Sequence, residues 1–199
     1  MVSITSSKDT ISLKDVYTIE KVGLLNQSFL LITCSVRAGS GMRLERTLII
    51  CAKGNGICES LRISSLFRED FLDFSEPVKS PIKVSVKTRY KVRLTLSGNK
   101  ASDYKLHAKV HGGRKSIKKR NGDYSYSRII ELKFDTKQNI FYSDQKYLAQ
   151  TFSVFSSKTN IENNQYIKGT FPMVELGDYK YYHIKGEWYE SDVPNNLSH

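Results

Sequence analysis

The sequence predicts an α+β fold, a single domain with a mainly antiparallel sheet and two amphipathic helices. Residues 82–96 alternate apolar and polar side chains, which is typical of a long strand with one buried face. Segments 63–74 and 147–155 repeat apolar residues at three- and four-residue steps, the spacing of a helix. The 199 residues fit one domain, and no alternating strand and helix pattern indicates a parallel sheet.

The first half of the chain predicts three strands and one helix. Residues 16–22 form a strand, and segments 28–37 and 42–52 form a hairpin around a Gly-containing turn. A break at 54–56 precedes a helix of about sixteen residues. Two prolines end this helix and make residues 77–81 the candidate hinge of the domain at 1–199. The apolar stripe of the helix consists of Ile63, Leu66, Phe67, Phe71 and Phe74.

The second half predicts further strands and a second helix. Residues 82–96 are the longest strand, and 104–111 and 124–134 alternate in the same way. Ser143 and Asp144 can cap the helix. Its apolar stripe consists of Tyr147, Leu148, Thr151, Phe152 and Phe155. The remaining predicted segments are a basic loop at 112–120, a polar loop at 156–168, an aromatic strand at 179–189 and a frayed C-terminus at 190–199.

Positive charge is concentrated in one segment. The chain has a net charge of +11, and residues 79–133 hold sixteen Lys or Arg against three acidic residues. The rest of the chain is therefore close to neutral. A focused basic segment attracts polyanions, whereas a device for general solubility would be spread along the chain.

The candidate polyanion-binding residues come from two strands and the loop between the second and third. On an extended strand, side chains of one face repeat at about 6.6 Å, so one face of 82–96 carries a row of cations about 33 Å long. Phosphates of RNA or DNA could bind this row, and so could acidic lipid headgroups. The plain alternative is an ordinary solvated face. The candidate residues are Lys83, Lys87, Arg89, Lys91, Arg93, Lys105, Lys109, Arg114, Lys115, Lys118, Lys119 and Arg120.

Two features beside this row have a second interpretation. The cluster at 114–120 could also act as a nuclear-import signal, and Gly112-Gly113 could let the backbone close on a phosphate. Tyr124 and Tyr126 could stack on bases, but they are in phase with Ile130 and Leu132, which favours the core.

One pattern is typical of an enzyme. Asp123 followed by Glu131 and Lys133 matches the spacing of PD-(D/E)xK metal-dependent nucleases, in which two carboxylates hold Mg²⁺. A turn aspartate and a solvent-facing charge pair explain the same residues. His107 and His111 lie about 13 Å apart on a strand, too far for one metal ion. We therefore expect no enzyme, no cofactor and no metal, with a nuclease as the alternative.

We expect an intracellular, cytoplasmic protein. The N-terminus lacks the features of a signal peptide, no apolar run is long enough to span a bilayer, and the three cysteines predict reduced thiols. In size, charge and expected build, the chain is similar to the small basic proteins of RNA viruses. Matrix proteins of negative-strand viruses, which bind nucleocapsid and acidic membrane, are the nearest class.

The predicted function is binding of RNA or a ribonucleoprotein by a non-enzymatic structural protein. The alternative within this class is a self-assembling capsid, movement or silencing-suppressor protein. We expect a homo-oligomer, and the aromatic strand near the C-terminus offers Trp188 and Tyr182 as candidate contacts. The sequence does not distinguish RNA, DNA and lipid as partners.

Overall fold

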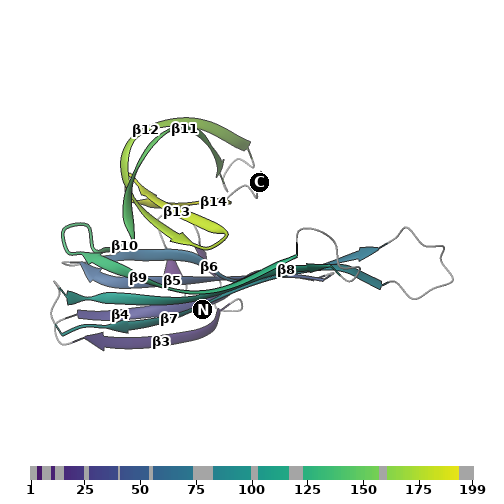
Figure 1. Ribbon diagram of the computed structural model, residues 1–199. Coiled ribbons are helices and arrows are strands. Elements are labelled where there is room, and N and C mark those ends of the chain that lie inside the picture. Colours follow the sequence, from purple (N-terminus) through teal and green to yellow (C-terminus); the bar gives the residue numbers. More distant parts are fainter. Residues whose placement is uncertain are drawn as a thin grey trace.

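The protein is built from antiparallel β-sheets. A computed structural model describes residues 4–5, 10–11, 16–24, 27–39, 41–53, 56–73, 83–99, 103–116, 123–156 and 161–192. All ladders among these residues are antiparallel, and the described ranges contain no α-helix (Figure 1). The predicted α+β fold with two amphipathic helices is therefore wrong. Within the same ranges, no helical segment has the length and hydropathy that a membrane crossing requires.

The larger sheet is an eight-stranded meander. Each strand pairs with its neighbour in the sequence, in the order β10-β9-β8-β7-β6-β5-β4-β3. A separate two-stranded ladder pairs β1 (Ile4–Thr5) with β2 (Thr10–Ile11). The strands of the large sheet are β3 (Val16–Leu24), β4 (Gln27–Gly39), β5 (Met42–Lys53), β6 (Gly56–Asp73), β7 (Lys83–Ser97), β8 (Lys105–Ser116), β9 (Tyr124–Asp135) and β10 (Ile140–Tyr142).

The smaller sheet has four strands in the order β11-β12-β13-β14 and lies over one face of the larger sheet. Its long β11–β12 hairpin curls strongly, while β6 and β7 extend beyond the area it covers (Figure 1). The opposite face of the larger sheet is turned away from it. The four strands are β11 (Asp144–Ser156), β12 (Ile161–Leu176), β13 (Tyr179–Ile184) and β14 (Glu187–Asp192).

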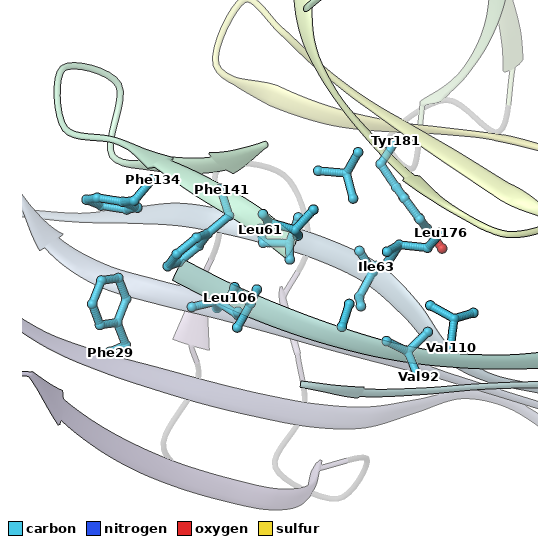
Figure 2. Packing of buried hydrophobic residues seen from close by; sticks show 14 of the residues in the cluster. Phe29, Leu61, Ile63, Val92, Leu106, Val110, Phe134, Phe141, Leu176 and Tyr181 are labelled. Carbon is cyan, nitrogen blue, oxygen red and sulfur yellow. The ribbon is translucent and has the colours of Figure 1, made fainter. Parts of the chain in front are cut away.

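The main core lies between the two sheets. Leu61, Ile63 and Leu106 on the larger sheet pack with Leu176 and Tyr181 of the smaller one (Figure 2). Each of these side chains is at most 1% exposed, and burial of such a side chain stabilises the fold by about 1.5–3 kcal/mol. Hydrogen bonds also join the sheets within this core: the Tyr90 hydroxyl donates to the Leu176 carbonyl, and the Ser64 amide donates to the Tyr181 hydroxyl.

Two smaller apolar clusters lie elsewhere. Successive side chains of a strand point to opposite faces, so Met173 and Tyr182 lie on the face of the smaller sheet opposite Val174 and Tyr181. They form a second cluster with Leu148, Ile167 and Ile184. A third cluster, on β4 and β5, consists of Ile32, Cys34, Leu48 and Ile50.

The first predicted helix is strand β6, and the even spacing of its apolar residues explains the error. Ile63 and Phe67 both pack on the main core. They are four residues apart, and this spacing returns a side chain to the same face of a strand and to nearly the same face of a helix. A β-bulge also breaks the strict alternation of this strand, because Ser64 pairs with Arg46 and Leu66 pairs with Glu45, which leaves Ser65 as an extra residue.

The second predicted helix is strand β11, which pairs with β12 along its whole length. Ser143 does not cap a helix. Its backbone amide and its hydroxyl both donate to the Met173 carbonyl and so hold the start of β11 against β12. Of the predicted stripe, Leu148 is buried whereas Tyr147 is 58% exposed. The pairing with β12 replaces the backbone hydrogen bonds that a helix would make.

The other predictions divide into confirmed strands and corrections near the C-terminus. The predicted strands at 16–22, 28–37, 42–52, 82–96, 104–111 and 124–134 are confirmed within a few residues. Residues 161–168 of the predicted polar loop belong to β12, and the predicted strand 179–189 is the β13–β14 hairpin. Lys185 and Gly186, with φ of 50° and 86°, form its turn. Glu190–Asp192 complete β14, while 77–81 and 193–199 lie outside the described residues.

Candidate functional site

The alternating strand β7 has the predicted phase over the part whose side chains are described. Tyr90 and Val92 are 2% and 6% exposed, whereas Lys91 and Arg93 are exposed to solvent. The next strand repeats this arrangement, with Leu106, Ala108 and Val110 buried and the side chains between them on the other face. The apolar face packs against the smaller sheet and not, as predicted, against two helices.

The β6–β7, β7–β8 and β8–β9 ladders gather the described outward side chains of their paired residues into one surface, which we call the basic face. Nine of its side chains are Lys or Arg and two are carboxylates, a net charge of +7 with histidine neutral. From the row of Lys87 to the row of Lys105, ten residues of strand correspond to about 33 Å. The charged and histidine residues of the basic face are Arg68, Asp70, Lys87, Arg89, Lys91, Arg93, Lys105, His107, Lys109, His111, Lys115, Glu131 and Lys133.

Basic residues stand directly opposite one another across the strands. Opposite side chains in an antiparallel pair have Cβ atoms about 4.5–5.5 Å apart, and like charges at this distance are destabilising. A bound anion would relieve the repulsion because it lies between the charges. The opposed pairs are Lys87 with Lys115, Lys91 with His111, Arg93 with Lys109, and Lys105 with Lys133.

Two carboxylates neutralise part of this face. Asp70 accepts from Arg89 at 2.6 Å and from Arg68 at 3.0 Å. Desolvation acts to raise the pKa of Asp70, but the two guanidinium groups outweigh it and lower the pKa. The hydrogen bond from Lys105 at 2.9 Å lowers the pKa of Glu131. Two predicted binding residues, Arg89 and Lys105, are thus already engaged by carboxylates.

The structure changes the membership of the predicted site. Arg114 lies opposite Thr88 and Tyr124 and is in phase with Val110, so it belongs to the other face of the sheet. Arg68 and Lys133 join the basic face. Of these two, Arg68 was assigned to a helix, so nothing in the sequence placed it beside Arg89. Lys118, Lys119 and Arg120 lie outside the described residues, and of Lys83 only the backbone is described.

Gly112 and Gly113 lie within strand β8 and not in a phosphate-binding loop. A Cβ atom on Gly112 would lie 2.6 Å from Cε1 of Tyr126, and one on Gly113 would lie 2.7 Å from the Tyr124 carbonyl oxygen. The Tyr126 hydroxyl accepts a hydrogen bond from the Asp178 amide of the smaller sheet. Tyr126 therefore packs between the sheets, as the core interpretation predicted, and its partly buried ring is no platform for bases.

The residues of the nuclease pattern do not come together. Asp123 precedes β9 and accepts from the Ser116 amide at 2.7 Å, which closes the end of the β8–β9 pair. Glu131 lies eight residues further along, about 26 Å from Asp123 on an extended strand. One metal ion cannot bind both carboxylates over this distance. In the described part of the chain, no three His, Cys, Asp or Glu side chains form a group suited to a metal.

The two aromatic residues predicted as subunit contacts have partners within this chain. Tyr182 is 6% exposed and belongs to the second apolar cluster. Trp188 packs against the main core, and its indole nitrogen donates to the Glu59 carbonyl. Tyr182 therefore has little surface left for a second copy, whereas Trp188 is partly buried.

No family model, no curated protein and no solved structure matches this chain. The basic face, through its geometry and charge, is therefore the feature of this protein that points to a function.

Proposed function

We propose that this protein is a non-enzymatic RNA-binding protein and that the basic face binds the phosphate backbone. The observation that supports this proposal is the direct opposition of basic residues across β7, β8 and β9. Such rows are unfavourable in the free protein and become favourable when phosphates lie between them. The resulting role is that of a structural protein that coats RNA or a nucleocapsid.

The composition of the basic face favours contacts to phosphates over contacts to bases. Single-stranded RNA is often held by exposed aromatic rings on which bases stack. Among the described residues, the large hydrophobic side chains exposed to solvent include two tyrosines, Tyr147 and Tyr166, and both lie on the smaller sheet. Without stacking, binding should depend little on base sequence.

The expected salt dependence can be estimated from the charges. Six cations of the basic face have no described carboxylate within salt-bridge distance: Lys87, Lys91, Arg93, Lys109, Lys115 and Lys133. If each neutralises one phosphate of a single strand, log K falls by about 4 per tenfold increase in salt. Between 50 and 200 mM salt the affinity should then fall about 300-fold.

The test is charge reversal with a matched control. The variant Lys91→Glu, Arg93→Glu, Lys109→Glu changes three exposed residues at the centre of the basic face. The control Lys137→Glu, Lys146→Glu, Lys168→Glu makes the same change in net charge at exposed positions elsewhere. We expect the first variant to lose RNA binding, in fluorescence anisotropy at 50 mM salt, and the control to retain most of it. Equal losses would mean that only net charge matters and would refute a localised site.

An acidic membrane surface is a second candidate partner, because one aliphatic side chain stands in the basic face. Ile129 is 71% exposed and lies opposite Lys109. An apolar side chain surrounded by cations can enter a bilayer while the cations bind lipid headgroups. Ile129→Ser should weaken binding to vesicles of phosphatidylserine and phosphatidylcholine but leave RNA binding unchanged. Unchanged vesicle binding would show that Ile129 does not enter the bilayer, and no vesicle binding by the wild-type protein would rule out the membrane as a partner.

A further inference from the structure

Two cysteine residues face each other in the β5–β6 hairpin. Cys51 and Cys58 are direct partners in the strand register, and their sulfur atoms lie 2.8 Å apart. Opposite residues in antiparallel strands have Cα atoms about 4.5–5.5 Å apart. This range falls within the ~4.4–6.8 Å that a disulfide spans. The spacing of the two strands is therefore compatible with a bond between the two sulfur atoms.

We propose that Cys51 and Cys58 are a dithiol that a small-molecule disulfide, such as oxidised glutathione, converts into a cross-strand disulfide. Cys58 is partly exposed and so is the thiol that the oxidant reaches first. Cys51 is 1% exposed and accepts a hydrogen bond from the Ser60 hydroxyl at 3.1 Å.

The exchange proceeds in two balanced steps. The Cys58 thiolate attacks one sulfur of oxidised glutathione, which forms a mixed disulfide and releases one glutathione thiolate. The Cys51 thiolate then attacks the Cys58 sulfur, which forms the protein disulfide and releases the second glutathione. The two protein thiols lose two electrons and two protons, and one oxidised glutathione becomes two reduced molecules.

The third cysteine residue provides an internal reference. Cys34 is buried in the cluster of Ile32, Leu48 and Ile50, and its thiol donates to the Arg46 carbonyl at 3.7 Å. It lies on β4, while the facing pair joins β5 and β6. Oxidation of the facing pair should therefore leave Cys34 as a thiol. This proposal is independent of RNA binding.

The test counts thiols in the full-length protein before and after treatment with oxidised glutathione. After denaturation, alkylation and mass spectrometry, the reduced protein should carry three alkyl groups and the oxidised protein one. Peptide mapping should join Cys51 to Cys58. A bond that involves Cys34, a stable glutathione adduct on the wild-type protein, or three alkyl groups after treatment would each overturn the proposal.

Two variants separate the steps. Cys51→Ser should stop at a glutathione adduct on Cys58, because no second thiol resolves it. Cys34→Ala should still form the cross-strand bond. If a variant does not fold, the peptide map of the oxidised wild-type protein still tests whether Cys51 is bonded to Cys58. An adduct on Cys34 in the Cys51→Ser protein would contradict the assignment of Cys58 as the accessible thiol.

Discussion

The substitution Gly112→Ala tests whether Tyr126 belongs to the packing between the sheets. A methyl group at position 112 would lie 2.6 Å from Cε1 of Tyr126 and closer still to Cζ and the hydroxyl oxygen. The ring cannot move away easily, because a Cβ on Gly177 would also lie within 2.6 Å of it. The Asp178 amide fixes the hydroxyl at 3.0 Å. The backbone at Gly112 does not have a positive φ, so alanine fits there apart from this contact.

The magnitude follows from two opposing effects. Overpacking of a tight contact lowers the free energy of unfolding by about 1–3 kcal/mol. Replacement of glycine by alanine in a strand raises it by about 0.5–1 kcal/mol. We expect a net loss of about 1–2 kcal/mol in the free energy of unfolding. For a protein of this size, that loss lowers the melting temperature by about 2–8 °C.

A double-mutant cycle with Tyr126→Ala isolates the contact. Once Tyr126→Ala has removed the ring, the new methyl group meets open space, so Gly112→Ala should be neutral or slightly stabilising in that background. The coupling energy between the two positions should be about 2 kcal/mol. The assay is urea unfolding followed by circular dichroism, with RNA affinity measured on each folded variant. If Gly112→Ala leaves the wild-type stability unchanged, or if Tyr126→Ala abolishes RNA binding in a folded protein, the assignment of Tyr126 to the core is wrong.

Two buried phenols, the Glu131 carboxylate and the phase of β7 give three further expectations. Burial raises the pKa of Tyr90 and Tyr181, so stability should fall above pH 10 by about 1.4 kcal/mol per pH unit for each phenol. In urea titrations between pH 9 and 11, the free energy of unfolding of Tyr90→Phe should fall less steeply with pH than that of the wild-type protein. The same dependence on pH in both proteins would contradict this expectation. Glu131→Gln should tighten RNA binding because it removes a carboxylate from the basic face. If the protein were instead a nuclease with Glu131 as a metal ligand, the same variant would lose Mg²⁺-dependent cleavage. Val92→Asp should unfold the protein because it buries an unpaired charge, whereas the Lys91→Asp variant should melt close to the wild-type temperature. If Lys91→Asp lowers the melting temperature more than Val92→Asp does, the assignment of the two faces of β7 is wrong.

The strand phase of β7 and β8 was predictable because a strand has a period of two over its whole length. Lys91 and Val92 therefore occupy opposite faces whatever the rest of the chain does. The sequence also placed the excess charge, since residues 79–133 hold sixteen of the basic residues. These properties are local and need no knowledge of the partners of a strand.

Both predicted helices failed for a reason that is not local. Ile63 and Phe67 are four residues apart, a spacing that fits one face of a helix and one face of a strand equally well. Only the pairing of β6 with β5 and β7 decided that this segment is a strand. In the same way, the pairing with β12 decided that Leu148 belongs to a strand.

The basic face depends in the same way on strand register. The sequence by itself determined the cationic row of β7. Only the tertiary structure placed Arg68 and Lys133 beside that row, moved Arg114 to the other face, and brought Asp70 against Arg89. The physical reason is that side-chain neighbours across a sheet follow from long-range hydrogen bonding between strands, which no single segment contains.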